Sequence, residues 1–286
     1  MKPEGKCIAF LIPVKKFGNG KSRLMPVFPD EIREDVRVKI NTSLFLDMMD
    51  ALVMFNEKES NLNIKVLICS SDEFVCQYVK KLGDYFIYID ENDILSENVP
   101  STNCQAIKLD EIINFMNNVA VNKYRASGTV LLMGDLPLLT MHDLQGLFKN
   151  FPDEDSFQDT KRVVISPSLG NGCNMIARFP PNIIDTRYSQ DTRPSFIEHV
   201  ELAKAYARIH GEKTASLLYI YKNLGIYLDL DTPEDLMNLY PLLLEVKPQS
   251  RLLSALRGIS INIKKTGCKD SRKVDISLMI TEEESC

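Results

Sequence analysis

Cys-Ile-Ala-Phe-Leu-Ile-Pro, residues Cys7–Pro13, is followed directly by Val-Lys-Lys-Phe-Gly-Asn-Gly-Lys-Ser-Arg-Leu, residues Val14–Leu24. The first segment is continuously apolar, which predicts a short strand covered on both faces. In the second, glycines let backbone N–H groups approach an anion closely, and cationic side chains supply fixed positive charge. A solvated basic loop is the alternative, because short Gly/Lys loops are common. We expect a phosphate-binding loop whose residues are Lys15, Lys16, Gly18, Gly20, Lys21 and Arg23.

The composition limits the classes of partner. The chain has 286 residues, of which 44% are hydrophobic and 26% charged, as in ordinary soluble globular proteins. A net charge of −5 argues against a protein that binds nucleic acid mainly through phosphate contacts. A basic loop on an acidic protein instead suits a small anionic ligand.

The cysteines and the N-terminal residues bear on the compartment. Seven cysteines are scattered without a C-x-x-C pair, which predicts free thiols in a reducing cytoplasm and no structural zinc. Charged residues at Lys2, Glu4 and Lys6 precede a short apolar run, so we expect neither a signal peptide nor a membrane span.

Short apolar runs alternate with helical patterns through most of the chain. This alternation predicts an α/β fold with an open, mostly parallel, doubly wound sheet and helices on both faces. The expected strands are Cys7–Pro13, Ile64–Cys69, Tyr85–Ile89, Thr129–Met133, Arg162–Ser166, Cys173–Ala177, and Leu217–Tyr221 with Gly225–Leu230. The expected helices are Glu31–Met54, Asp72–Leu82, Gln105–Val121, Met141–Phe148, Ser195–Ile209 and Pro233–Leu244, the last with Thr232 as its N-cap.

The character of the sequence changes after Val246. Residues 1–246 are expected to form the main domain, and residues 247–286 a C-terminal extension rich in charge. Alternation in Ile259–Ile263 and Val274–Met279 predicts two strands of a hairpin, which is marginal alone and should pack on this domain or on a partner subunit. We expect a homodimer.

Two acidic segments lie where ligands bind. Asp135, in Leu-Leu-Met-Gly-Asp-Leu-Pro-Leu-Leu at Leu131–Leu139, ends an apolar strand, where open parallel sheets form their binding crevice. A turn aspartate is the alternative. Asp229 and Asp231 are spaced by one residue on a predicted strand end and would share a face, although Asp231 could serve only the helix start. Clustered carboxylates favour a bound Mg²⁺ that also grips phosphate oxygens.

Taken together, these segments resemble the 2-phospho-L-lactate guanylyltransferases. That family makes the guanylated precursor of the deazaflavin coenzyme F420 in archaea and belongs to the nucleotidyltransferases with a GT-A-like, Rossmann-like fold. The resemblance runs from about Cys7 to about Leu244. Its segments are Ile12-Pro13-Val14-Lys15 with Gly20-Lys21-Ser22-Arg23-Leu24, Gly134-Asp135-Leu136-Pro137-Leu138-Leu139, Gly172-Cys173-Asn174, Ser195-Phe196 with His199, and Asp229-Leu230-Asp231-Thr232-Pro233-Glu234-Asp235-Leu236.

The resemblance implies roles for these residues. Lys21, Asp135 and Asp229 would be catalytic, with Mg²⁺ held by Asp135 and Asp229 and with Asp231 as a further candidate ligand. The triphosphate of GTP would lie on the loop through Lys15, Gly18, Gly20, Lys21 and Arg23. Asn103 matches an asparagine near the guanine base, although Ser101-Thr102 replaces the Gly-Leu that usually precedes it. The acceptor would contact Cys173, where the family commonly has Thr, together with Asn174, Thr192 and Ser195.

The implied reaction needs no covalent intermediate. The acceptor phosphate would attack the α-phosphorus of GTP in line, and catalysis would come mainly from positioning and charge stabilisation. A phosphate with a second pKa of about 6 is already anionic near neutral pH, so no general base is needed. His199 could either pack in the core or face the acceptor.

Other activities share this architecture, because a fold does not fix a function. The acceptor could be phosphoenolpyruvate or 3-phosphoglycerate in place of 2-phospho-L-lactate. The protein could also be a sugar-phosphate or cytidylyl transferase, or a nucleotide-binding subunit without catalysis. Retention of Lys21, Arg23, Asp135 and Asp229 together speaks against the last of these.

Overall fold

The computed structural model describes residues 7–59, 62–98, 107–152, 160–189, 193–259, 261–266 and 273–278. In chain order the elements are β1 (Cys7–Pro13), η1 (Phe17–Asn19), η2 (Met25–Val27), α1 (Arg33–Lys58), β2 (Asn63–Ser70), α2 (Glu73–Val79), β3 (Phe86–Asp90), α3 (Glu91–Asn98), α4 (Leu109–Tyr124), β4 (Ala126–Leu132), α5 (Met141–Phe148), β5 (Arg162–Pro167), β6 (Cys173–Phe179), α6 (Ser195–Ile209), α7 (Thr214–Leu217), β7 (Leu218–Ile220), α8 (Leu224–Tyr227), α9 (Pro233–Val246), α10 (Arg251–Gly258), β8 (Ile261–Thr266) and β9 (Lys273–Leu278).

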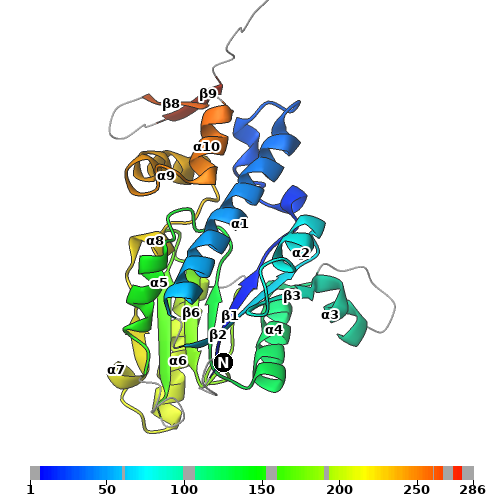
Figure 1. Ribbon diagram of the computed structural model, residues 1–286. Coiled ribbons are helices and arrows are strands. Elements are labelled where there is room, and N and C mark those ends of the chain that lie inside the picture. Colours follow the sequence, from blue (N-terminus) through cyan, green and yellow to red (C-terminus); the bar gives the residue numbers. More distant parts are fainter. Residues whose placement is uncertain are drawn as a thin grey trace, which may run out of the picture.

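Seven strands form one open sheet in the order β3-β2-β1-β4-β6-β5-β7 (Figure 1). Strand β1 pairs in parallel with β2 and β4, and β2 with β3. Only β6 runs against its neighbours β4 and β5, while β7 is parallel to β5. The mostly parallel α/β sheet predicted from the apolar runs is confirmed.

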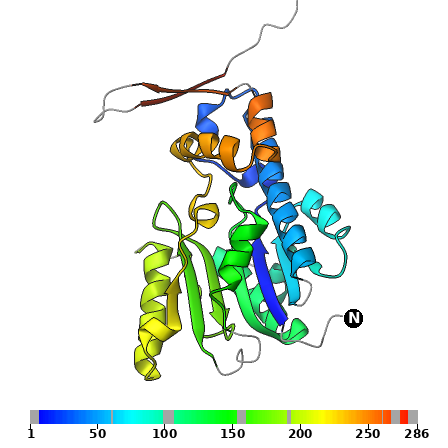
Figure 2. The same cartoon turned by 60° about the vertical axis from the view of Figure 1, so that its left-hand side comes forward.

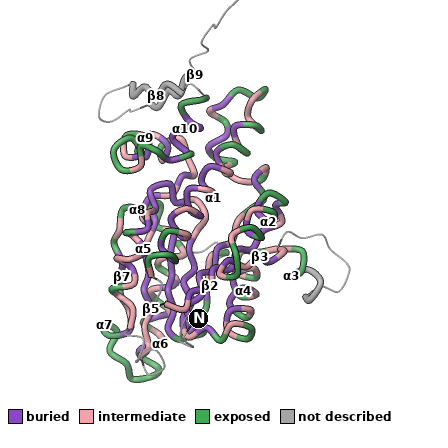
Figure 3. The backbone as a smooth tube through the Cα atoms, in the orientation of Figure 1, coloured by how far each residue is buried: buried purple, intermediate pink, exposed green. Residues whose placement is uncertain are grey.

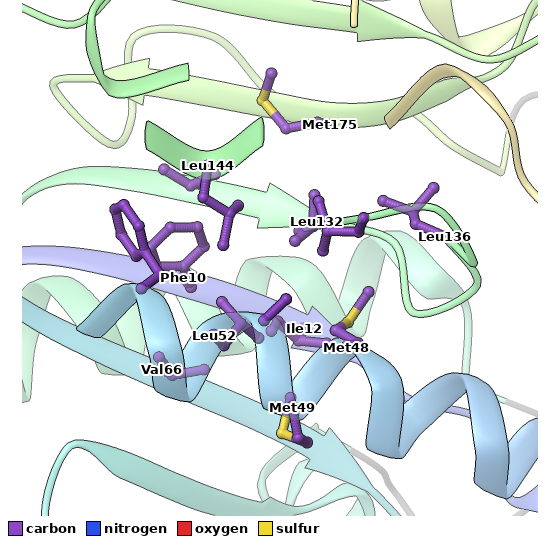
Figure 4. Packing of buried hydrophobic residues seen from close by; sticks show 14 of the residues in the cluster. Phe10, Ile12, Met48, Met49, Leu52, Val66, Leu132, Leu136, Leu144 and Met175 are labelled. Carbon is purple, nitrogen blue, oxygen red and sulfur yellow. The ribbon is translucent and has the colours of Figure 1, made fainter. Parts of the chain in front are cut away.

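Helices cover both faces of the sheet. On one face α1, α2 and α5 bury a cluster that includes Phe10, Met48 and Leu144 (Figure 4). On the other face α4 and α6 pack over residues such as Leu11 and Ile176. Strands β1 and β6 are therefore buried at every residue except Pro13 (Figure 3), which explains why they read as nearly continuous apolar runs.

A third apolar cluster lies beyond the carboxyl ends of the parallel strands. It joins η2 and the first half of α1 to α9 and α10 (Figures 1 and 2). Helix α10 packs on α1, where the Asp47 carboxylate accepts the N–H groups of Arg251 and Leu252 at 2.9 and 3.1 Å. Helices α9 and α10 thereby pack against the end of the loop that follows β1.

The chain after Val246 differs in part from a simple extension. Helix α10, which has only eight residues, was not among the predicted elements, yet its Leu252, Leu253 and Leu256 are fully buried. Strands β8 and β9 then pair antiparallel, with Ile261 opposite Leu278 and Ile263 opposite Ile276. The division into two domains stays a prediction.

The strand predicted at Gly225–Leu230 is wrong. The chain forms the short helix α8 there and then continues without regular structure to Asp231. The Asn223 side chain caps α8 by accepting the N–H of Ile226 at 3.2 Å, which favours a helical turn over a strand. The predicted N-cap at Thr232 is confirmed, with Asp235 completing a capping box.

Within the described residues, every helix is too short or too polar to cross a bilayer.

Candidate active site

A cavity of about 590 Å³ opens at the carboxyl ends of β1, β2 and β4. This is the edge of the sheet at which open α/β folds bind ligands. Of the predicted site residues that the structure describes, all but Lys16 and Gly18 line it: Lys15, Gly20, Lys21, Arg23, Asp135, Cys173, Asn174, Ser195, Asp229 and Asp231. Asn103 and Thr192 lie outside the described residues.

The loop after β1 is held in place by helix α1. The amide of Asn41 donates to the carbonyl oxygen of Phe17 at 2.7 Å, and Nη1 of Arg37 donates to that of Gly18 at 2.7 Å. Gly20 lies so close to α1 that a Cβ there would come within 2.8 Å of the Asn41 amide nitrogen. A side chain at position 20 would therefore displace the Asn41 side chain, which holds the loop by its bond to Phe17.

Lys21 is the centre of the charged cluster. Its Nζ lies 2.8 Å from Oδ2 of Asp135 and 3.0 Å from Oδ1 of Asp231, and only 6% of the side chain is exposed. Its backbone is left-handed, with φ of 59°, a conformation that costs energy for any residue with a Cβ. Burial alone would lower the pKa of Lys21, but the charges of Asp135 and Asp231 prevail and raise it. The ammonium stays charged.

The three carboxylates differ in their electrostatic state. Burial, and then the charge of Asp135, raises the pKa of Asp229 to about 6. Burial would also raise the pKa of Asp231, but Lys21 and Arg23 hold it below its usual value. Arg23 donates to Oδ2 of Asp231 at 2.7 Å. The charge of Asp231 is thus balanced by two cations, whereas Asp229 faces the negative charge of Asp135.

Backbone pairing brings two distant segments together. The N–H of Leu230 donates to the carbonyl oxygen of Asp135 at 3.2 Å, which places Asp229 and Asp231 beside the end of β4. Across the described residues, no three Asp, Glu, His or Cys side chains converge as a set of metal ligands. Two carboxylates with hard oxygen donors, Asp135 and Asp229, repel each other here, and a divalent cation between them would relieve that repulsion.

On the acceptor side, two predicted side chains already have partners in the protein. The Cys173 thiol is 3% exposed and donates to the carbonyl oxygen of Met175, with Sγ and O 3.3 Å apart. Burial raises its pKa to about 12. The Asn174 amide donates to the carbonyl oxygen of Ile226 at 2.9 Å. Their side chains therefore shape the cavity wall, while Ser195, half-buried at the start of α6, faces the cavity with its helix N-terminus.

His199 packs in the core. It is fully buried, and its Nε2 accepts the N–H of Arg187 at 2.8 Å, so the neutral ring carries its proton on Nδ1. Burial, together with Arg178, lowers its pKa to about 4. Its ring lies 4.9 Å from that of Tyr188, which lines the cavity. Of the two sequence-based alternatives for His199, the structure supports packing.

Several polar residues of the cavity wall were not among the predicted site residues, and they include Asn41, Glu91 and Tyr188. Glu91 directly follows strand β3, so the strand-end rule that selected Asp135 would have selected it too. Asn41 lies in the middle of a long helix, and Tyr188 follows no periodic pattern. The sequence offered no local signal for these two.

Comparisons with known proteins agree with this geometry. The sequence model of the family described as "Guanylyl transferase CofC like" matches residues 8–275. Proteins named 2-phospho-L-lactate guanylyltransferase are similar to this chain. One from Methanosarcina barkeri is 26% identical over 232 residues, which cover 80% of this chain and 84% of that protein. One from Methanocaldococcus sp. is 24% identical over 230 residues, which cover 80% of each.

A solved structure shares the fold. It is described as a nucleotide-diphospho-sugar transferase from Desulfovibrio desulfuricans G20, and it superposes with a TM-score of 0.59 at 17% identity over 88% of this chain and 94% of that one. The family match spans nearly all of the sheet and every cavity segment described above. By that match, this chain belongs to the CofC-like guanylyl transferase family.

Proposed function

We propose that this protein transfers GMP from GTP to the phosphate of 2-phospho-L-lactate, with release of diphosphate, in the biosynthesis of coenzyme F420. The observation that carries the proposal is the buried Lys21 ammonium, held 2.8 Å from Asp135 at the strand ends of a cavity of about 590 Å³. A volume of this order accommodates a nucleotide and a small acceptor. The relatives named for this reaction support the choice of substrates.

The residues of the chain divide the work. Lys15, Lys21 and Arg23 surround the triphosphate with positive charge, and Lys21 faces the negative charge that develops on the α-phosphate and on the leaving diphosphate. An oxygen of the acceptor phosphate forms a bond to the α-phosphorus as the bond from that phosphorus to the bridging oxygen of the β-phosphate breaks. No proton has to move, so the cavity needs no general base.

The carboxylates Asp135 and Asp229 fit a Mg²⁺ ion, which they would hold at the mouth of the loop. When bound, the ion supplies positive charge to the phosphate oxygens. The position of Asp231 beside Lys21 and Arg23 favours Asp229 as the second ligand. We also infer that the protein acts in the cytoplasm as a homodimer, with free thiols at Cys7, Cys69, Cys76 and Cys173.

Thermal unfolding with each nucleoside triphosphate and Mg²⁺ tests the nucleotide. A ligand present at about 100 times its Kd stabilises a protein by about 2.7 kcal/mol. We expect the largest stabilisation with GTP. Equal stabilisation by CTP or by sugar-nucleotide precursors would instead support one of the other transferases.

Mass spectrometry of the products tests the acceptor. The protein is incubated with GTP and, separately, with 2-phospho-L-lactate, phosphoenolpyruvate and 3-phosphoglycerate. We expect a guanylated product and diphosphate with 2-phospho-L-lactate at the highest kcat/KM. A higher value with either of the other acceptors would replace the substrate and keep the reaction, and no product with any of the three would contradict the proposal.

A further inference from the structure

Glu91 lies in the same cavity as the catalytic cluster, with no role in the reaction derived above. We propose that Glu91 reads the guanine base, its carboxylate accepting the N1–H and the 2-amino N–H of GTP. The inference rests on the proposed function and adds to it the residue that selects the nucleotide.

The order of strands in the sheet places Glu91 at the end of the cavity where the base of a bound nucleotide would lie. Glu91 follows β3, Lys21 follows β1, and Cys173 begins β6, so the three lie at the first, third and fifth positions in the order β3-β2-β1-β4-β6. Two inter-strand spacings, roughly 10 Å, separate β3 from β1. A nucleotide whose phosphates lie at Lys21 would extend its base away from the acceptor side, toward Glu91.

The wall around Glu91 suits the flat faces of a base ring. Cys69 ends β2 in the cavity wall, and Ile107, Leu109 and Ile112 line it from the start of α4. Cys69 is 2% exposed, and its pKa is raised to about 12 by burial and then by the charge of Glu91. Glu91 is thus a charged group set beside apolar surface, the combination by which pockets orient a ligand.

The carboxylate is fixed but not neutralised. The Ser71 hydroxyl donates to Oε2 of Glu91 at 2.9 Å, which orients the group from the end of β2. Among the described residues, no lysine or arginine pairs with Glu91, whereas Asp231 in the same cavity has two cationic partners. Within the described part of the chain, Oε1 and the second lone pair of Oε2 therefore remain to accept hydrogen bonds.

Guanine is the base that matches this acceptor. Its Watson–Crick edge presents two adjacent donors, N1–H and the 2-amino group, at the spacing of the two carboxylate oxygens. Adenine and cytosine each present a ring-nitrogen acceptor beside a single amino donor, and the N3–H of uracil lies between two carbonyl oxygens. Each of these would place an acceptor against the carboxylate, which leaves buried polar groups unpaired and costs affinity.

A favourable interaction with the dipole of α3 would explain only part of what is observed for Glu91. Glu91 is the first residue of α3, where a negative charge interacts favourably with the helix dipole. That role would be met by a carboxylate pointing to solvent. It does not account for a carboxylate in the cavity wall with its orientation set by Ser71.

The experiment measures steady-state kinetics with GTP, ITP, ATP and CTP for the wild type and the Glu91→Gln variant. ITP keeps N1–H and lacks the 2-amino group. We expect the wild type to prefer GTP to ITP in kcat/KM by about 10- to 100-fold, as for a hydrogen bond to a charged group. In Glu91→Gln the preference should fall to within about threefold, through a higher KM for GTP at similar kcat.

Two further variants keep the result interpretable. Glu73→Gln makes the same change at an exposed position on α2 and should leave kcat/KM unchanged for all four nucleotides. Glu91→Asp keeps the charge on a shorter side chain and should retain a preference for GTP over ITP even if Glu91→Gln is poorly folded. Circular dichroism and melting temperatures identify any variant that does not fold.

The outcomes separate the two proposals. A wild type that prefers another nucleoside triphosphate would defeat the proposed function, and this inference with it. A wild type that prefers GTP, together with a folded Glu91→Gln variant that keeps the full GTP-to-ITP ratio, would defeat the role of Glu91 alone. Loss of the GTP preference in Glu91→Asp as well as in Glu91→Gln would also overturn carboxylate recognition.

Discussion

Nζ of Lys21 lies 2.8 Å from Oδ2 of Asp135, although 114 positions separate the two residues in the chain. The pairing joins the loop after β1 to the end of β4, which are neighbouring strands. It holds a cation and a carboxylate in the cavity at the place where the proposed reaction needs both. The position of a phosphate bound here is thereby tied to that of the acidic residues.

Asp135→Asn should abolish turnover with little effect on the fold. The amide keeps the size of the side chain and can still accept from Lys21, but it loses the charge that Mg²⁺ requires. We expect diphosphate release from GTP to fall by at least about 100-fold, the scale of a lost electrostatic group in an active site. Asp30→Asn, a change at an exposed position, is the matched control. Turnover near the wild-type rate in a folded Asp135→Asn variant would refute the metal role.

Lys21→Met should lower both activity and stability. It leaves Asp135 and Asp231 near each other without the buried cation, and these carboxylates are about a third exposed, so water screens part of their repulsion. We expect the free energy of unfolding to fall by about 1–3 kcal/mol in urea titrations. Because the loss comes from ionised carboxylates, it should shrink as the pH falls toward 4. A loss that does not change with pH would point to packing alone.

Ser195→Ala should weaken the acceptor and spare the nucleotide. Ser195 begins a helix of 15 residues whose N-terminal N–H groups face the cavity and suit an anionic acceptor. We expect KM for the three-carbon phosphate to rise several-fold while KM for GTP stays nearly constant, the pattern for lost acceptor binding. If the variant instead raises KM for GTP and leaves that of every acceptor unchanged, the nucleotide and the acceptor must be assigned to the opposite halves of the cavity.

The free energy of unfolding should fall in mild acid, because His199 stays neutral in the folded protein and is protonated in the unfolded one. Its pKa is about 4 in the folded protein against about 6.5 when unfolded, so the unfolded state binds more protons between these values. The contribution is complete above pH 6.5 and is lost as the pH falls toward 4. One proton corresponds to about 1.4 kcal/mol per pH unit.

Urea unfolding of the wild type and of His199→Gln between pH 4.5 and pH 7 measures this effect. The wild type should lose stability more steeply on acidification, with the difference approaching one bound proton near pH 5.5. Parallel slopes in the two proteins would show that His199 titrates alike in the folded and unfolded states.

Truncation at two points should separate the roles of the C-terminal segments. Ending the chain after Val246 removes α10, whose three fully buried leucines each contribute about 1.5–3 kcal/mol. We expect this protein to melt at a much lower temperature or not to fold. Ending it after Ile259 keeps α10 and removes β8 and β9, so the melting temperature of the body should change little.

The second truncation also tests the homodimer. Strands β8 and β9 form a separate two-stranded antiparallel ribbon, and such a ribbon is marginal without a partner surface. We expect the shorter chain to sediment as a monomer and the full chain as a dimer. If the two chains sediment equally, as dimers or as monomers, β8 and β9 do not form a dimer contact.

Local patterns in the sequence predict the seven strands of the sheet, each to within a few residues of its limits, but also a strand at Gly225–Leu230 that does not form. The helices Met141–Phe148 and Ser195–Ile209 were predicted with the bounds that the structure has, and Thr232 begins α9 as expected. Apolar periodicity and N-capping act between residues only a few positions apart, so a linear sequence displays them directly. The strand ends at Asp135 and the loop after β1 were found for the same reason.

Which of these residues meet, and what electrostatic state each adopts, depends on the tertiary fold. Asp231 neutralises Lys21 and Arg23, whereas Asp229 faces Asp135, and no local pattern distinguishes two aspartates one residue apart. The left-handed backbone of Lys21 and the burial of α10 against α1 also depend on contacts across the whole chain. Charge interactions and burial follow from distances in space, and those distances are set by the order of the strands in the sheet.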